Sequence, residues 1–151
     1  MEKIKLNEAI KNEKVYRIDN KDDTSFTQNN YFLINGIIRF ISQKKRKLQI
    51  DEDTKYLPIE YFENTLIEIE IEYINLNHFD TDINIFKNND CYLIDEDGYH
   101  FDIDSVENNN GINYFIPKVK QKVKLNFLVP NEEAKYEFEI KRATFKEVEW
   151  K

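Results

Sequence analysis

The stretch "LIEIEIEYI", residues 66–74, alternates apolar and acidic side chains with a period of two. Its isoleucines share one face, and Glu68, Glu70 and Glu72 occupy the other, as in a strand with one buried side. The same alternation recurs in "KVKLNFLVP", residues 122–130, and in "KYEFEIK", residues 135–141. Helices do not produce this period, so the sequence predicts an all-β protein.

Length and composition indicate one globular domain over residues 1–151. The chain is 40% hydrophobic and carries eleven Phe and nine Tyr, which is too many for a disordered polypeptide. A chain of this length buries a core without metals or disulfides. The abundance of Ile, Asn and Lys is typical of AT-rich coding sequences and favours a bacterial or phage origin.

Charge is distributed very unevenly along the chain. Residues 56–117 hold 14 Asp/Glu and one Lys, whereas the segments before and after each carry a net charge of +3. Two hypotheses fit this pattern. The glutamates of residues 67–72 can face the lysines of "KVKQKVK", residues 118–124, across neighbouring strands. Alternatively, the acids form a patch for a basic partner or a cation. The candidate binding residues are Glu68, Glu70, Glu72, Asp95, Glu96, Asp97, Asp102 and Asp104.

The stretch "LIDEDGYHFDID", residues 93–104, places five acids around Gly98. A calcium EF-hand loop needs acids at alternate positions before its glycine, a Glu six residues after it, and flanking helices. Here Asp95, Asp97 and Gly98 are too close together, position 104 is Asp, and the flanks alternate like strands. The stretch therefore predicts a hairpin turn with Gly98 in the left-handed conformation, and a cation site is the less favoured alternative.

The N-terminal third predicts further strands and turns. Asn35-Gly36 lies between apolar segments, which is the typical sequence of a two-residue hairpin turn. The four bases at 44–47 then predict a solvated loop or hairpin tip, with a nucleic-acid contact as the alternative. Residues 19–30 predict a polar loop, and residues 51–64 a long connection containing Pro58. "KIKL" and "KVYRI" predict short strands flanking one turn of helix.

No group of residues in the sequence identifies a reaction. There is no phosphate-binding glycine loop, no nucleophile elbow and no CxxC pair. His78 and His100 are too few for a histidine metal site, and Cys91 predicts a buried structural thiol. Trp150 either pins the last strand or is exposed at an edge. We therefore expect a protein that is not an enzyme and that has no catalytic residue, metal ligand or cofactor.

With these strands placed, the order "IEIEIEYIN", "CYLIDEDGYHF", "KLNFLVP" resembles a bacterial immunoglobulin-like domain of unknown function. That family is typical of secreted lipoproteins and mycobacterial immunogenic extracellular antigens. The resemblance covers residues 64–141 and implies an antiparallel immunoglobulin-like β-sandwich of about seven to nine strands with Greek-key connections. Its motifs are structural and imply no active site. The matching residues are Asn75, Leu93, Asp95, Gly98, Phe127, Val129 and Pro130.

These observations lead to three hypotheses of function. The first is a non-catalytic interaction module that engages a protein partner through loops or an acidic sheet face. The second is a small acidic phage or mobile-element inhibitor that masks a basic nucleic-acid-binding site of a host enzyme. The third is an extracellular adhesion domain assisted by calcium. None involves direct binding of nucleic acid by this chain, and the pattern specifies no oligomeric state.

The sequence also bears on location. No apolar run approaches the ~18 residues that span a bilayer, and the first residues lack the apolar core of a signal peptide. We expect a cytoplasmic protein if the chain is full length, and an extracellular or cell-surface protein if a signal segment was removed.

Overall fold

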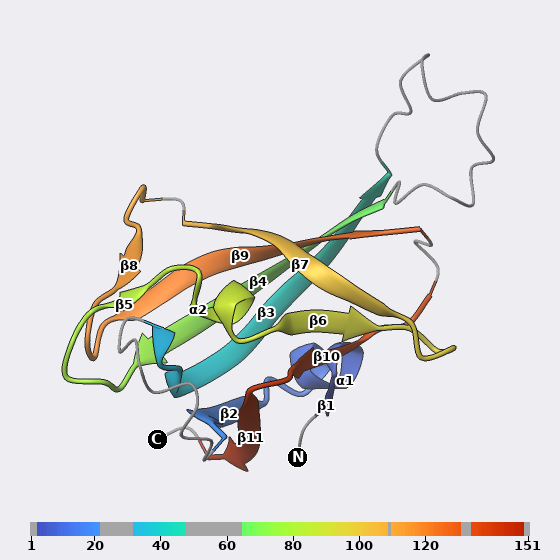
Figure 1. The fold of residues 1–151 in the computed structure, drawn as a ribbon. Helices are drawn as coiled ribbons and strands as arrows, with labels where there is room; N and C mark the ends of the chain where they lie inside the picture. The colour runs from blue at the N-terminus through green and yellow to red at the C-terminus, as the bar shows by residue number, and fades with distance from the viewer. Residues whose placement is uncertain (1–2, 22–31, 48–64, 109, 131–133, 150–151) are drawn as a thin grey trace.

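The computed structural model describes residues 3–21, 32–47, 65–108, 110–130 and 134–149 (Figure 1). Nine of the described strands form one antiparallel sheet in the order β1-β10-β6-β7-β9-β4-β3-β2-β11, and β5 pairs with β8 in a small second sheet. The elements in chain order are β1 (Lys3–Lys5), α1 (Leu6–Lys11), β2 (Val15–Asn20), β3 (Asn35–Lys47), β4 (Thr65–Asn75), β5 (Thr81–Asp82), α2 (Ile85–Asn88), β6 (Cys91–Ile94), β7 (His100–Glu107), β8 (Tyr114–Phe115), β9 (Lys120–Val129), β10 (Glu137–Ile140) and β11 (Ala143–Val148).

The all-β prediction is confirmed, and the period of two explains why. Ile69 of β4, Leu125 of β9 and Phe138 of β10 are fully buried, while the glutamates and lysine next to Ile69 and Leu125 are partly exposed. Strands β6, β7 and β9 are neighbours, and the chain then returns so that β10 lies beside β6. This order, β10-β6-β7-β9, is that of a Greek key. Because nine of the described strands join in one continuous sheet, the immunoglobulin-like sandwich of two packed sheets stays a prediction.

The sheet curls until its two ends come close to each other. Strands β10 and β11 lie near opposite ends of the strand order, yet only Lys141 and Arg142 separate them in the chain. Helix α1 likewise links β1, at one edge, to β2, next to the other edge. A flat sheet could not satisfy connections this short, so the sheet is nearly barrel-like.

Aromatic rings fill the interior of the curled sheet. The Phe40 ring lies edge-on to Phe138, with centroids 5.0 Å apart, and the Tyr73 ring lies edge-on to Phe115 at 4.8 Å. Edge-to-face contacts of this kind stabilise the core beyond the burial of apolar area. The interior therefore joins residues from both halves of the chain into one core.

The hairpin predicted at Asn35-Gly36 is wrong, because both residues belong to the start of β3. Gly36 pairs with Ile18 on β2 and with Asn75 on β4, so it lies inside the sheet. A Cβ atom at Gly36 would lie 2.3 Å from the Ile74 carbonyl oxygen and 2.6 Å from the Tyr73 ring. The glycine is required for close approach of the chains rather than for a turn.

The loop predicted for the four bases at 44–47 is also wrong. These residues are exposed but extended, and they continue β3 alongside residues 65–68 of β4. The long β3–β4 pair extends past the rest of the sheet at the upper right of Figure 1. The predicted loop at 19–30 begins later, since Asp19 and Asn20 complete β2.

Of the remaining sequence predictions for the N-terminal third and Trp150, one is confirmed and the others fall largely on residues outside the described part of the chain. The short N-terminal strands and the helical turn between them are confirmed as β1, α1 and β2. Most of the 19–30 loop, all of the 51–64 connection, and Trp150 lie outside the described residues. Within the part of the chain that the structure describes, neither helix is long and apolar enough to cross a membrane.

Candidate functional site

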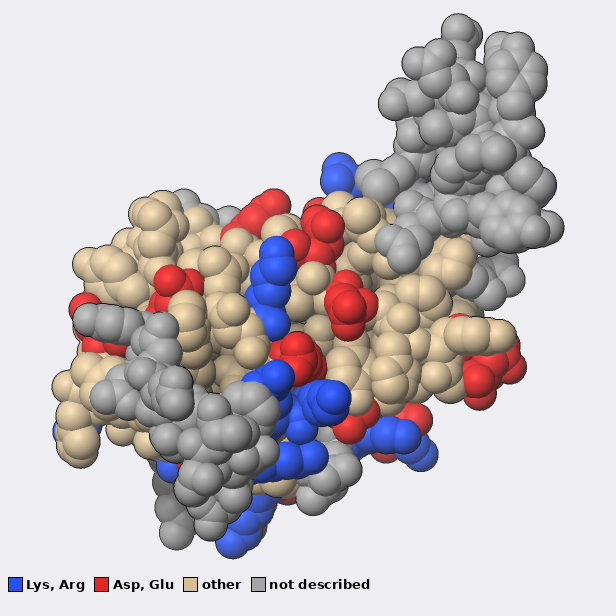
Figure 2. Space-filling view, viewed as in Figure 1, with Lys and Arg blue, Asp and Glu red and all other residues tan. Residues whose placement is uncertain are grey.

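The outward side of the sheet carries charge in stripes that follow the strand order. The glutamates of β4 lie between two basic strands, because β4 pairs with β9 on one side and with β3 on the other. Glu70 is opposite Lys124 of β9, and Glu68 is opposite Lys44 of β3. In Figure 2 the acidic side chains accordingly form several groups with basic side chains between them.

Glu72 is the most strongly engaged of these acids. It is 8% exposed, its Oε1 accepts a hydrogen bond from Arg39 Nη2, and its Oε2 lies 3.5 Å from Lys120 Nζ. Burial alone would raise its pKa, but the hydrogen bond and positive charge of Arg39, together with Lys120, lower the pKa below 4.5. Glu72 is therefore a structural anion with two cationic partners.

The prediction that the β4 glutamates and β9 lysines lie on neighbouring strands is confirmed, and it changes how the candidate acids are grouped. β9 separates the β4 glutamates from the acids of β7, so the eight residues do not share one acidic face. Glu68 additionally lies 3.9 Å from Arg46. The second group comprises Asp95, Glu96 and Asp97, in the turn between β6 and β7, together with Asp102 and Asp104 on β7.

The turn between β6 and β7 confirms the hairpin predicted for the stretch around Gly98. Asp95 Oδ1 accepts hydrogen bonds from the backbone N–H groups of Asp97, at 3.0 Å, and Tyr99, at 2.9 Å. Gly98 has φ of 87° and donates its N–H to the Asp95 carbonyl oxygen at 3.1 Å. Asp95 therefore shapes the turn, and Gly98 supplies the left-handed conformation that it needs.

The acids of this hairpin differ from Glu68 and Glu72 of β4 in forming no ion pair with another described residue. Among the described residues, no ion pair within 4.0 Å includes Asp95, Glu96, Asp97, Asp102 or Asp104. Glu96 accepts a hydrogen bond from the backbone N–H of Lys135 at 3.1 Å. The described residues also contain no group of three or more His, Cys, Asp or Glu placed to hold a metal ion.

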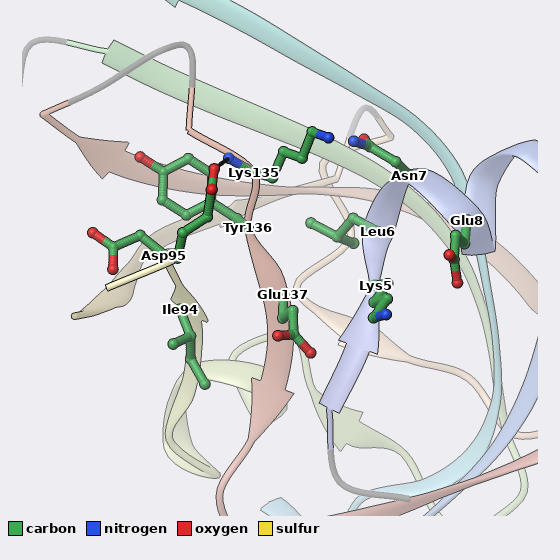
Figure 3. Close-up of a pocket in the computed structure, with 10 residues that line it drawn as sticks. Lys5, Leu6, Asn7, Glu8, Ile94, Asp95, Lys135, Tyr136 and Glu137 are labelled. Atoms are coloured by element: carbon green, nitrogen blue, oxygen red, sulfur yellow. Dashed lines mark hydrogen bonds between the residues drawn. The ribbon is translucent and has the colours of Figure 1, made fainter. Parts of the chain in front are cut away.

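A cavity of about 350 Å³ lies beside the hairpin, between the β6–β7 turn, the start of β10 and the start of α1 (Figure 3). Leu6, Ile94 and Tyr136 provide apolar surface, and Leu6 points from the N-terminal segment toward the Tyr136 ring. The charged and polar residues of its lining are Lys5, Asn7, Glu8, Asp95, Glu96, Lys135 and Glu137.

Sequence reasoning identified two residues of this cavity, Asp95 and Glu96, and missed the rest. Apart from Ile94 at the end of β6, the missing residues come from segments near positions 5–8 and 135–137, which the pairings of β1 with β10 and of β10 with β6 bring to the hairpin. Lys5 is opposite Glu137, and Glu137 is opposite Ile94. Periodicity within a segment gives no signal of such a pairing, because it depends on residues more than 100 positions apart.

The histidines and the cysteine offer no alternative site. His78 and His100 are exposed, and the His100 ring stacks on Tyr92 with centroids 4.3 Å apart. Cys91 is buried, as predicted, and burial together with the negative charge of Asp102 raises the pKa of its thiol. A buried thiol with a raised pKa is a poor nucleophile, so Cys91 is a core residue.

Comparison with known proteins finds no match to a family model, to a curated protein or to a solved structure. The resemblance to the bacterial immunoglobulin-like domain therefore stays a prediction.

Proposed function

We propose that the protein is a non-catalytic module that binds a basic partner protein through the β6–β7 hairpin and the adjacent cavity. The observation that carries the proposal is the contrast between the two groups of acids. The β4 glutamates lie among bases of the same chain, whereas the hairpin acids have no ion-pair partner among the described residues. Uncompensated charge attracts partners of opposite sign and speeds their association.

The cavity beside the hairpin provides a concave surface next to these negative charges. Its apolar surface, formed by Leu6, Ile94 and Tyr136, suits the methylene stem of a lysine or arginine, and the carboxylates of Asp95 and Glu137 belong to the same lining. The Tyr136 ring already lies 5.6 Å from Lys45 Nζ of the same chain, which is the kind of cation–ring contact that a basic side chain makes. A basic side chain of the partner entering this cavity therefore fits the surface better than an acidic one.

We also propose that the domain is related to immunoglobulin-like domains, and the strand order is the observation that supports this relationship. The Greek-key order β10-β6-β7-β9 occurs in most β-sandwiches. Immunoglobulin-like domains commonly bind with loops at the ends of their sheets, and the β6–β7 turn is such a loop. An experimental structure that divides the strands into two packed layers would support this kinship.

The binding proposal can be tested with an oligolysine peptide as a defined basic probe. We expect NMR titration to shift the backbone signals of the hairpin at low salt, and the affinity to fall as salt is raised. Reversing the charge at Asp97, Asp102 and Asp104 to lysine should abolish the shifts. These three positions are chosen because Asp95 and Glu96 accept hydrogen bonds from backbone N–H groups.

A matched control separates the hairpin from the overall charge. Lysine at Glu13, Glu147 and Glu149, which are exposed away from the hairpin, changes the net charge by the same amount. This control should retain most of the binding. The proposal would be contradicted if the two variants lost the same affinity for the peptide. It would also be contradicted if binding changed neither with salt nor on reversal of the hairpin charges.

A further inference from the structure

The chain contains the dipeptide Asn-Gly twice, at Asn35-Gly36 and at Asn110-Gly111. This dipeptide is chemically labile, because glycine lacks the Cβ that hinders attack by its backbone nitrogen on the preceding side chain. The nitrogen bonds to the asparagine Cγ, the side-chain nitrogen leaves as ammonia, and a succinimide ring forms. Water then opens the ring at either carbonyl, which gives aspartate or isoaspartate without any oxidant or reductant.

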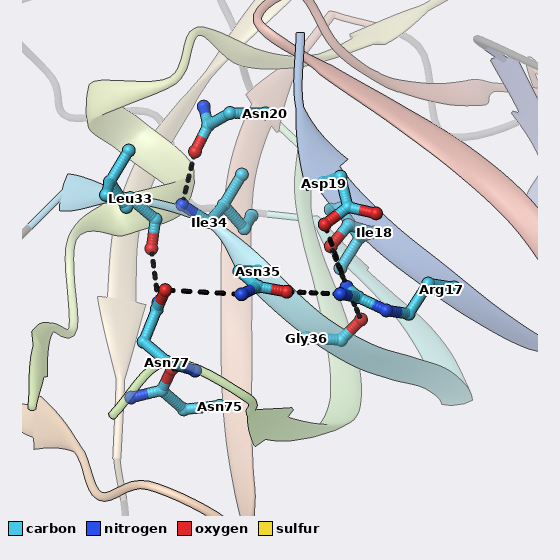
Figure 4. Close-up of polar contacts among 10 residues, drawn as sticks. All are labelled: Arg17, Ile18, Asp19, Asn20, Leu33, Ile34, Asn35, Gly36, Asn75 and Asn77. Carbon is cyan, nitrogen blue, oxygen red and sulfur yellow. Dashed lines mark hydrogen bonds and ion pairs between the residues drawn. The ribbon is translucent and has the colours of Figure 1, made fainter. Parts of the chain in front are cut away.

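The structure holds Asn35 away from this reaction (Figure 4). Its Oδ1 accepts a hydrogen bond from Arg17 Nη2, and its Nδ2 donates to Asn77 Oδ1 at 3.4 Å. Gly36, which would provide the attacking nitrogen, lies between β2 and β4 in the interior of the sheet. Both reacting groups are thus fixed, and ring closure requires β3 to leave its neighbours.

Asn110-Gly111 has the opposite surroundings. Both residues are exposed in the connection between β7 and β8, and Gly111 has φ of 68°. The Gly111 N–H donates to the Asn108 carbonyl oxygen of the same turn, at 3.1 Å. A Cβ added at Gly111 would meet nothing within 4 Å, so no neighbouring atom packs closely against this side of the turn.

From this contrast we infer that Asn110 is a deamidation site of the folded protein, whereas Asn35 reacts only when the sheet opens. The modification matters for the local surface, because Asn110 lines a groove of about 400 Å³ with Val119, Lys120 and Lys122. Deamidation places a new carboxylate in this groove beside its lysines. The surface next to β9 therefore becomes more acidic as the protein ages.

Peptide mass spectrometry tests the inference. The protein is incubated at neutral to mildly alkaline pH, folded or in urea, and the peptides that carry Asn35 and Asn110 are followed over time. In the folded protein we expect Asn35 to deamidate roughly a hundredfold more slowly than Asn110, because interior strands open rarely. In urea the two rates should become similar.

An Asn110→Gln variant provides the control, since glutamine would need a larger and slower-forming ring. It should remove the modification of the folded protein and leave the reaction of Asn35 in urea unchanged. Two results would overturn the inference. One is deamidation of Asn35 in the folded protein as fast as that of Asn110, and the other is an intact Asn110 in folded protein over a period that converts it in urea.

Discussion

The glutamates of β4 and the acids of the β6–β7 hairpin come from the same acidic segment, residues 56–117, but their surroundings differ. Glu72 lies between Arg39 and Lys120, whereas Asp97 and Asp102 have no ion-pair partner among the described residues. The strand order makes the difference, because it places β4 between two basic strands. The same acidic run is therefore neutralised in one part of the fold and left without ion-pair partners in another, among the described residues.

Gly36→Ala should have the largest effect on stability. The added methyl group disrupts the β3–β4 pairing, which places the bases of β3 beside the β4 glutamates. The added methyl would lie 2.3 Å from a backbone oxygen, and backbone cannot rotate away as a side chain can. We expect a loss of about 3 kcal/mol or more in the free energy of unfolding, measured by urea denaturation.

Gly98→Ala is the matched control on the hairpin side. It meets no atom within 4 Å, and its only penalty is the positive φ of 87°. The expected loss is about 1 kcal/mol. Equal losses at the two glycines would show that β3 and β4 are not packed as closely as described.

Glu72→Gln should have the next largest effect, since it removes the charge that Arg39 and Lys120 share. We expect the free energy of unfolding to fall by roughly 1–2 kcal/mol. Glu70→Gln is the control, because Glu70 is half-buried and has no ion pair within 4.0 Å among the described residues. It should change the free energy by less than about 0.5 kcal/mol.

The pH dependence of stability provides a second measurement on the same variant. Since folding lowers the pKa of Glu72, the unfolded state binds the proton more readily. The stabilisation is therefore present above the ordinary pKa of 4.5 and is lost as pH falls through the lower pKa of the folded state. Glu72→Gln should lose less stability than the parent chain over this acidic interval. An identical slope in both proteins would contradict the assignment.

Asp95→Ala and Asp97→Ala should have the smallest effects on stability and distinguish the roles of two neighbouring hairpin acids. Asp95 accepts two backbone hydrogen bonds, so its loss should cost about 1 kcal/mol. Asp97 is exposed and should be neutral within about 0.5 kcal/mol. Thermal unfolding measures both, and a costly Asp97→Ala would mean that this acid has a structural partner.

The strands of the C-terminal half could be predicted from sequence because their period of two records which side faces the core. Ile69 and Leu125 are buried as that pattern requires. The hairpin at Gly98 was also predictable, since its turn depends on residues within a few positions of one another. Local chemistry was sufficient in these places.

The strand neighbours were harder to predict, because they depend on distant residues. Asn35-Gly36 has the sequence of a turn, yet the pairing of Gly36 with Ile18 and Asn75 places it within the sheet. The cavity beside the hairpin escaped prediction for the same reason, since Leu6 reaches it only through the pairing of β1 with β10. Alternation identifies a strand but not its partners.

The pairing of the first strands with the last ones has a consequence for biosynthesis. Lys3 lies opposite Glu139, and Val15 lies opposite Val148. Both N-terminal strands therefore pair with residues that are more than 120 positions later in the sequence. During synthesis on the ribosome, β1 and β2 therefore remain without these partners until β10 and β11 have been translated. Contacts this distant in sequence form slowly, and strand edges that are still unpaired are exposed to aggregation in the meantime.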